Sequence, residues 1–337
     1  MFFPGYTLFA FDNTTMILRS LMYTILLFAI PGLAKAQQTD TLVKKLDSLS
    51  QKTVDEGGQT NIIAPKAYNE TTKITFKTYF ILLGSDFKQQ LLTPFTLDKK
   101  GWAKTAGFAA LTAGIMLADE PVQKVAVKQR KYKTVTNLSK YITNTGGLYE
   151  SYTLAALGAY GFLFKNEKMK TTTYLATQSY ITAGIIGTLI KTLTGRQRPS
   201  SYDPNHVEAE PRFHGPFGNT GKDFDGKKLN GSFPSGHTTV AFAAATVYAK
   251  EYADKPIVPI LAYTGAGLIG LSRITENRHW TSDVFVGAVL GYFCGKQVVN
   301  NYHRYAKIEN DKAHKQHISL NFNMYDGIMM SGLVYRP

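Results

Sequence analysis

The sequence PSGHTTVAFAAATVYAK, residues 234–250, decides the fold expected for this chain. Pro234 and Gly236 predict a turn, and Ser235 is a good N-cap for the apolar helix that follows. The N–H groups at a helix start have no acceptor within the helix and attract anions. His237 stands beside that start and can donate a proton to a leaving oxygen. The pattern predicts an anion site at a helix start, although an ordinary capped helix with an incidental histidine fits it equally well.

The sequence SRITENRHWTSD, residues 272–283, is the most informative piece downstream. Arg273 supplies a guanidinium group, and His279 and Asp283 are four residues apart, so both can lie on one helix face. A carboxylate on one ring nitrogen fixes the tautomer and makes the other nitrogen more basic. His279 would then be a competent nucleophile toward phosphorus. Metal binding is the rival interpretation, but the nearby cations would repel a divalent ion, and no other His or Cys has a fitting spacing.

The sequence KTLTGRQRP, residues 191–199, contributes further cations upstream. Arg198 offers a planar fork that grips phosphate oxygens in pairs, whereas Lys191 adds a point charge. Taken alone, these two residues are better explained by a solvated helix end. The pattern assigns no role to the remaining charged residues of these motifs, which are expected at the surface or behind the site: Arg196, Glu276 and Arg278.

Apolar periodicity predicts an all-α fold with a six-helix bundle core. The segments are rich in Ala, Gly and Thr, small residues that let helices pack closely. An additional surface helix is expected over residues 79–92, before the bundle. The six predicted core helices cover residues 100–118, 148–164, 172–193, 235–250, 256–271 and 280–299.

The flanking segments divide the chain further. Residues 1–36 carry a secretory signal, with an apolar stretch after Arg19 and a small-x-small cleavage site at residues 34–36, although an uncleaved anchor is the alternative. Residues 37–98 form a polar leader and the surface helix, and residues 99–305 form the helical domain. Residues 306–337 form a β-hairpin tail with its turn at Asp326-Gly327. The loop 200–233 is either a substrate-facing lid or a floppy insertion.

Composition limits the partners. Lys and Arg number 38 against 24 Asp and Glu, a formal charge of +14 that favours anionic partners such as phosphate compounds or anionic lipid surfaces. No zinc spacing or aromatic ribonucleoprotein motif supports nucleic acid. Cys294, the only cysteine, lies in an apolar run and is predicted to be a buried, inert thiol. A periplasmic helical bundle resting on a membrane and an integral membrane protein both stay open.

Together the three pieces read Lys-x6-Arg-Pro, Pro-Ser-Gly-His and Ser-Arg-x5-His-x3-Asp, in that order. This resembles the signature of the type 2 phosphatidic acid phosphatase superfamily, over about residues 100–300. The superfamily includes lipid phosphatases, class A acid phosphatases and vanadium haloperoxidases. The resemblance implies a helical core in which the three motifs converge. Because of its signal segment, the chain is expected in the cell envelope, either periplasmic after signal cleavage or membrane-associated.

The resemblance also implies roles for the residues that match. Lys191, Arg198 and Arg273 would hold the phosphoryl oxygens, assisted by the backbone of Ser235 and Gly236. His279 would attack phosphorus and form a phosphohistidine, Asp283 would orient it, and His237 would protonate the leaving alkoxide and later activate water. No metal or cofactor is implied, because the fixed cations offset the charge.

The expected function is therefore a metal-independent phosphatase acting on a lipid phosphate, a lipid pyrophosphate or a small phosphate ester. A soluble periplasmic acid phosphatase of broad specificity is the first alternative, and a vanadate-dependent haloperoxidase is a more distant one. A catalytically idle envelope protein is the alternative from another class.

Overall fold

The computed structural model describes residues 41–52, 63, 65–146, 148–200, 202–218, 221–222, 226, 228–315, 318–325 and 328–335. The chain divides into two compact units, Met1–Ser48 and Leu49–Pro337, and each is considered by itself. The helix α2 (Thr41–Lys52) begins in the first unit. The predicted signal segment lies outside the described residues. Everything below concerns the second unit.

The described part of the second unit is almost entirely helical, so the predicted all-α class is confirmed. Two short 3-10 helices, Pro65–Ala67 and Thr93–Phe95, flank the first long helix. The α-helices are α3 (Phe76–Leu92), α4 (Lys99–Leu117), α5 (Asp119–Gln129), α6 (Lys133–Thr145), α7 (Leu148–Leu163), α8 (Glu167–Thr194), α9 (Gly236–Glu251), α10 (Ile257–Thr275) and α11 (Thr281–Lys315).

The expected number of six helices is wrong, because the described residues hold ten α-helices. The six predicted segments correspond to α4 and to α7 through α11, and the surface helix corresponds to α3. The helix α5 was not predicted, because a proline such as Pro121 commonly ends a helix. Proline is tolerated in a first turn, however, where its missing N–H has no helical acceptor. The helix α2 lies in the predicted polar leader, and α11 continues past the expected boundary at residue 305 to Lys315.

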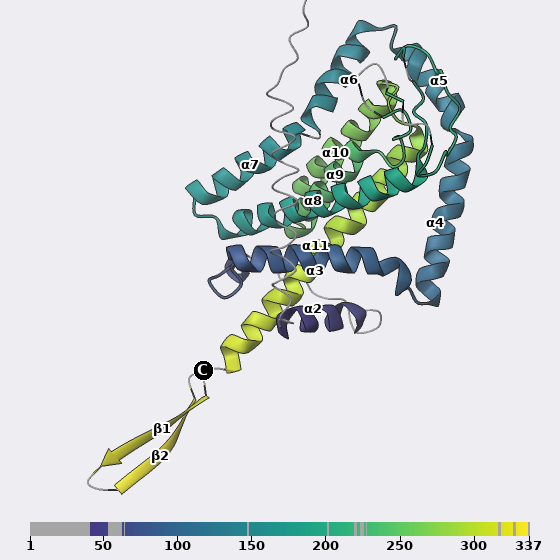
Figure 1. Ribbon diagram of the computed structural model, residues 1–337. Helices are drawn as coiled ribbons and strands as arrows, with labels where there is room; N and C mark the ends of the chain where they lie inside the picture. The colour runs from purple at the N-terminus through teal and green to yellow at the C-terminus, as the bar shows by residue number, and fades with distance from the viewer. Residues whose placement is uncertain are drawn as a thin grey trace, which may run out of the picture. The chain divides into compact units, whose positions relative to one another are not determined.

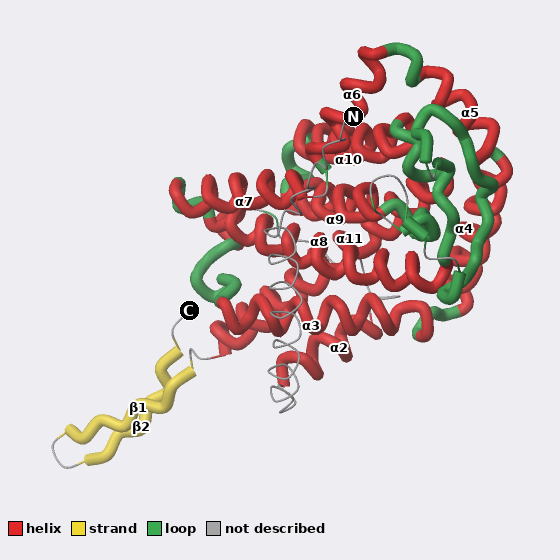
Figure 2. The backbone as a smooth tube through the Cα atoms, turned by 45° about the horizontal axis from the view of Figure 1, so that its top comes forward, coloured by secondary structure: helices red, strands yellow, loops and turns green. Residues whose placement is uncertain are grey.

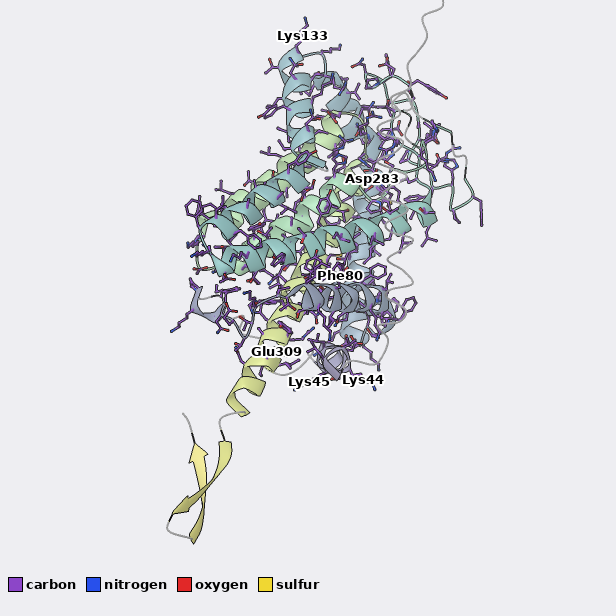
Figure 3. The ribbon with its side chains drawn as sticks, turned by 60° about the vertical axis from the view of Figure 1, so that its left-hand side comes forward. Lys44, Lys45, Phe80, Lys133, Asp283 and Glu309 are labelled. Carbon is purple, nitrogen blue, oxygen red and sulfur yellow. The ribbon has the colours of Figure 1, made fainter. Side chains whose placement is uncertain are left out.

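The helix α9 is the centre of the unit and packs against α8, α10 and α11. Figures 1 and 2 show α8, α9 and α10 side by side, with α11 crossing them. Small side chains on α9 allow this close approach. One buried cluster joins Ala243 to α8 and to Cys294 of α11, and Cys294 is a buried free thiol, as expected. Figure 3 shows Asp283 near the start of the long α11 and Glu309 toward its other end.

Three glycines on α11, four residues apart, bring its backbone into contact with α9. A Cβ on Gly287 would lie 2.8 Å from the carbonyl oxygen of Ser235. On Gly291 it would lie 2.2 Å from the carbonyl oxygen of Thr239, and on Gly295 it would lie 2.5 Å from that of Ala243. Any side chain there would push the helices apart, so these glycines set the distance between α9 and α11.

Several helices expose large apolar side chains. Among the described residues, α10 is the one helix long and apolar enough to cross a membrane. The exposed apolar residues on α7, α8 and α10 include Phe162, Leu163, Ile181, Ile185, Leu189, Ile260, Leu261 and Leu271.

At the C-terminal end, β1 (Ile318–Tyr325) pairs antiparallel with β2 (Ile328–Tyr335). The turn predicted at Asp326-Gly327 lies outside the described residues.

Candidate active site

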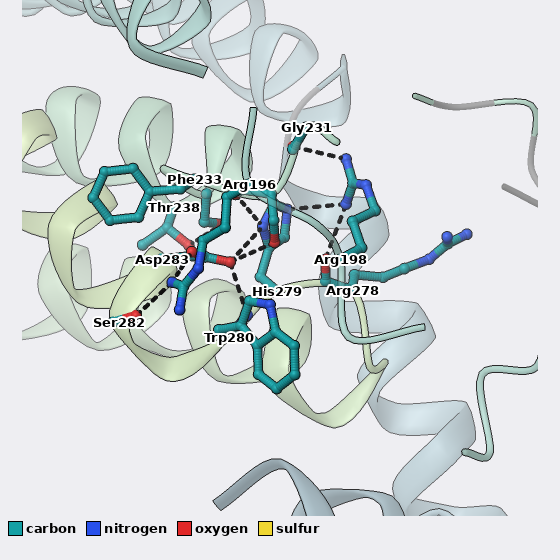
Figure 4. A network of polar contacts seen from close by, with 12 residues as sticks. Arg196, Arg198, Gly231, Phe233, Thr238, Arg278, His279, Trp280, Ser282 and Asp283 are labelled. Atoms are coloured by element: carbon teal, nitrogen blue, oxygen red, sulfur yellow. Dashed lines mark hydrogen bonds and ion pairs between the residues drawn. The ribbon is translucent and has the colours of Figure 1, made fainter. Parts of the chain in front are cut away.

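The three sequence motifs meet at the ends of α8, α9 and α10. Arg198 follows α8, Ser235 precedes α9, and His279 lies in the turn between α10 and α11. The Nη1 atom of Arg198 is 3.5 Å from the Nε2 atom of His279. Segments that are dozens of residues apart in the sequence therefore form one polar site (Figure 4).

His279 is almost fully buried, and its ring is held in one orientation. Its Nδ1 atom lies 2.8 Å from the carbonyl oxygen of Ser232, which can only accept a hydrogen bond, so Nδ1 carries the proton. In the neutral ring this leaves Nε2, the atom that faces Arg198, unprotonated. Burial lowers the pKa of His279 well below its ordinary value, and the charges of Arg198, Lys191, Arg273 and His237 lower it further. The result is a neutral imidazole whose lone pair points toward fixed cations.

The expected contact between Asp283 and His279 is replaced by an indirect one. The Oδ2 atom of Asp283 is 3.7 Å from the Nδ1 atom of His279, too far for a hydrogen bond. Asp283 instead accepts hydrogen bonds from the Ser232 hydroxyl at 2.5 Å and from the Trp280 backbone N–H at 2.9 Å. Asp283 thus fixes Ser232, and the carbonyl of Ser232 fixes the histidine ring. Nothing in the motifs pointed to Ser232, which lies in the irregular loop just before Pro234.

The two arginines of the site are buried, and each is held by protein oxygens. Arg198 donates from Nη1 to the carbonyl of Arg278 at 2.9 Å and from Nη2 to that of Gly231 at 3.2 Å. Arg273 donates from Nη1 to a carboxylate oxygen of Glu276 at 2.5 Å. Two of the three charged residues left without a role therefore support the arginines: Glu276 through its side chain and Arg278 through its backbone.

Lys191 lies in the last turn of α8, where its ammonium group approaches the start of α9. A Cβ on Gly236 would come 3.5 Å from the Nζ atom of Lys191. The lysine charge therefore stands beside the first N–H groups of α9, which have no acceptor within the helix. Lys191 and the Gly236 turn, both expected to bind phosphoryl oxygens, therefore lie side by side.

The Ser235 turn differs in detail from its prediction. Ser235 holds the N-cap position of α9, but its side chain makes no capping hydrogen bond and accepts one from the Thr238 hydroxyl instead. Its backbone N–H donates to the carbonyl oxygen of Asp283 at 2.9 Å, so that N–H is engaged within the protein. This bond ties the start of α9 to the start of α11. Gly236 and His237 form the first turn of α9, and His237 is half-buried.

Arg196 was expected at the surface or behind the site, and it is almost completely buried behind it. It donates from Nη1 to Asp283 at 2.6 Å and from Nη2 to Asp119 at 2.7 Å. Asp119 opens α5, directly after the predicted helix 100–118 ends. Both residues lie among other polar residues in the sequence, so nothing there indicated that they pair.

The loop 200–233 contributes a wall of the site. A cavity of about 310 Å³ lies between the end of α8 and the loop and is lined by Lys191, Arg198, Asn230 and Gly231, among others. The loop is attached to the segment before His279, because the Asn277 amide donates to the carbonyls of Pro204 and His206. In its described residues the loop thus lines the cavity beside Lys191 and Arg198 and is attached to the segment before His279, while its role as a lid stays a prediction.

Comparison with known proteins points in one direction. Residues 173–307 match the model of the PAP2 superfamily. A curated relative, the lipid A 1-phosphatase of Porphyromonas gingivalis, is 48% identical over 73 residues, which cover 21% of this chain and 16% of the relative. Lipid phosphate phosphatase 1 of Arabidopsis thaliana is 34% identical over 143 residues, which cover 36% of this chain and 42% of the relative. The chain spans less than half the length of either relative.

Two solved structures also resemble this chain. The first is LpxE from Aquifex aeolicus, with 24% identity, a TM-score of 0.39, and coverage of 54% of this chain and 94% of that one. The second is a transmembrane PAP2-type phosphatidylglycerolphosphate phosphatase from Bacillus subtilis, with 23% identity, a TM-score of 0.43, and coverage of 62% and 94%.

Proposed function

We propose that this chain, whose residues 173–307 match the PAP2 superfamily, is a phosphatase acting on phosphorylated lipids. One observation carries the proposal. The neutral imidazole of His279 presents an unprotonated Nε2 atom 3.5 Å from the Arg198 guanidinium, in a buried site whose other charges include Lys191 and Arg273. A nucleophile aimed at a cluster of cations fits a phosphoryl group, which is electrophilic at phosphorus and anionic at its oxygens.

The proposed reaction has two steps. In the first, Nε2 of His279 attacks phosphorus, the bond to the leaving oxygen breaks, and His237 gives its proton to that oxygen. In the second, His237 takes a proton from water, the resulting hydroxide attacks phosphorus, and the N–P bond breaks to release inorganic phosphate. Lys191, Arg198 and Arg273 bind the phosphoryl oxygens in both steps, so the reaction proceeds without a metal ion.

The substrate class follows from the apolar surface and the relatives. Both curated relatives described above are named as phosphatases of lipids. The exposed apolar faces of α7, α8 and α10 suit a protein that works in or on a membrane, where it meets lipid head groups. We therefore place the protein in the cell envelope with a lipid phosphate as substrate. A broad-specificity acid phosphatase shares the same chemistry and would differ in preferring small soluble esters.

The test measures phosphate release in the presence of EDTA from p-nitrophenyl phosphate and from lipid phosphates in detergent micelles. His279→Ala should reduce kcat by roughly three orders of magnitude or more, because nucleophile and proton donor act as a unit. His206→Ala is the matched control, since that histidine side chain is 74% exposed and pairs only with Asp203 among the contacts described. Turnover retained in His279→Ala would remove His279 as the nucleophile. A preference for the small ester over every lipid would support the acid phosphatase instead.

A second assay addresses the covalent step. With a 32P-labelled substrate and rapid quenching, the wild-type protein should retain label that is stable in alkali and lost in acid, as a phosphoramidate is. The label should be missing in His279→Ala. Absence of label from a turning-over wild-type protein, together with an isotope pattern of direct water attack, would exclude the phosphohistidine.

A further inference from the structure

The buried face of α5 touches the segment that carries His279. Asp119 and Gln123, one helical turn apart, are both fully buried. The carboxylate of Asp119 accepts hydrogen bonds from the backbone N–H of Ser282 at 2.8 Å and from its hydroxyl at 2.5 Å. The amide of Gln123 donates to the carbonyl of Ile274 at 3.0 Å and to the Asn277 side chain at 2.7 Å. The helix therefore holds both sides of the turn in which His279 lies.

This turn has a backbone that needs outside support. Asn277 has a φ of +60°, a left-handed conformation that costs a non-glycine residue free energy. Its side chain is bound on both sides, by Gln123 from α5 and by the loop carbonyls of Pro204 and His206. Arg130, just after α5, adds a hydrogen bond to the carbonyl of Thr275 at 2.9 Å. The conformation before His279 is thus supported by the loop carbonyls and also by Gln123 and Arg130, which lie outside the segment matching the PAP2 superfamily.

A chain of buried polar contacts leads from α5 to the histidine ring. Arg196 lies between two carboxylates, 2.7 Å from Asp119 and 2.6 Å from Asp283. Asp283 binds the Ser232 hydroxyl, and the Ser232 carbonyl accepts the Nδ1 proton of His279. Figure 4 shows the part of this network around Arg196, Asp283 and His279. Each of the three charged groups is at most 1% exposed, so none can be solvated by water if a partner is lost.

We propose that Asp119 is a positioning residue for the phosphatase reaction: through Arg196, Asp283 and Ser232 it fixes the direction in which Nε2 of His279 points. The proposal rests on the function proposed above. A buried ion pair is weak evidence for stability on its own, because hydrophobic residues of similar volume often serve as well. The arrangement here is different because every link is a hydrogen bond with a defined direction, and the last link sets the tautomer of the nucleophile.

The experiment compares Asp119→Asn with Glu120→Gln in the full-length protein. Glu120 is the next residue of the same helix turn, but its carboxylate is partly exposed and pairs with Lys124 at the surface. We expect Asp119→Asn to lower kcat for p-nitrophenyl phosphate by roughly 10- to 100-fold, as is typical of residues that orient a reacting group from behind. The KM and the inhibition constant of inorganic phosphate should change by less than about threefold, since the phosphate-binding cations are untouched. Glu120→Gln should match the wild type in all three.

A second readout is independent of activity. Hydrogen–deuterium exchange of the peptide covering residues 277–283 should be faster in Asp119→Asn by roughly tenfold, the effect of losing about 1.4 kcal/mol of local protection. Exchange in α9 and in the hairpin strands should not change. If Asp119→Asn does not fold, Ser282→Ala replaces it, because the lost hydroxyl donates to Asp119 and accepts from Nη1 of Arg196 at 2.7 Å. Its removal loosens the contact between Asp119 and Arg196 and should lower kcat with KM retained.

The outcomes separate the two proposals. A wild-type protein that turns over no phosphate ester contradicts the proposed function, whereas faster exchange at residues 277–283 would still report the contact from α5. Unchanged kcat in Asp119→Asn beside an active wild type overturns the positioning role. The positioning role is also overturned if KM of Asp119→Asn rises as much as kcat falls, because that pattern means a damaged binding site.

Discussion

Replacing Asp283 by asparagine tests the arrangement on which the site depends. One oxygen of the carboxylate accepts from Arg196 at 2.6 Å, and the other accepts from the Ser232 hydroxyl and the Trp280 N–H. An asparagine has one acceptor oxygen and one NH2 group. Whichever way it is turned, the NH2 group faces a donor that cannot accept: the Arg196 guanidinium in one orientation, the Trp280 N–H in the other.

The cost can be worked out from these contacts. Hydrogen bonds to a charged group contribute about 1.5–3 kcal/mol each, and asparagine loses at least one of them while weakening the rest. Removing one partner of a buried ion pair costs about 3–5 kcal/mol. Arg196 keeps Asp119 as a second partner, so we expect the lower end, about 3 kcal/mol of unfolding free energy. Ser232 loses its anchor as well, and a misplaced imidazole should lower kcat by roughly 100-fold.

The assay combines thermal melting of the purified protein in detergent with steady-state turnover of p-nitrophenyl phosphate. Asp203→Asn serves as the control, because that carboxylate lies on the exposed loop and pairs with His206. Ser232→Ala separates the two links: it removes the hydroxyl that binds Asp283 but keeps the carbonyl that binds His279, so its effect should be intermediate. If Asp283→Asn keeps kcat within about threefold of wild type and its melting temperature within about one degree, this account of the histidine is wrong.

Four further predictions follow from individual residues. Gly195→Ala should destabilise the protein by at least about 2 kcal/mol in chemical denaturation, because φ is +53° and a Cβ would lie 2.1 Å from the carbonyl oxygen of Gly215; Gly84→Ala, in open space, is the control. Lys191→Ala should raise KM roughly tenfold or more while His279 stays reactive, which a KM–kcat comparison checks. Folding lowers the pKa of His279, so as pH falls the unfolded chain protonates this histidine before the folded protein does. The contribution of His279 to folding stability is complete above about pH 6.5 and is lost as pH falls through the folded pKa. His279→Gln should therefore melt with a weaker acid dependence than wild type. Dialysis against EDTA should leave kcat unchanged, and restoration of lost activity by a divalent ion would contradict the metal-independent mechanism.

Much of the site could be predicted because each motif places a charged or nucleophilic residue at a helix end. The ends of α8, α9 and α10 carry the predicted site residues Lys191, Arg198, His237 and His279. Sequence spacing fixes which residues are near one another along a helix, and helix ends are marked by Pro, Gly and Ser.

The indirect contacts could not be predicted, for a physical reason. The expected hydrogen bond from Asp283 to His279 assumed that both lie within one regular helix, whereas α11 begins only at Thr281, after the histidine. A four-residue spacing across a helix start does not place two side chains on one face. Asp119 and Arg196 were missed because their partnership spans 77 residues, and only the tertiary packing of α5 brings them together.

The glycine contacts between α9 and α11 have a consequence for substrate range. With the two backbones touching at Gly287, Gly291 and Gly295, the start of α9 and the turn bearing the nucleophile cannot slide past each other. A bulkier head group cannot be accommodated by spreading this pair of helices. Under the function proposed above, tolerance for different lipids should therefore come from the loop residues that line the cavity, such as Pro216 and Asn230. Chimaeras that exchange the loop 200–233 between relatives should transfer head-group preference while leaving the chemistry intact.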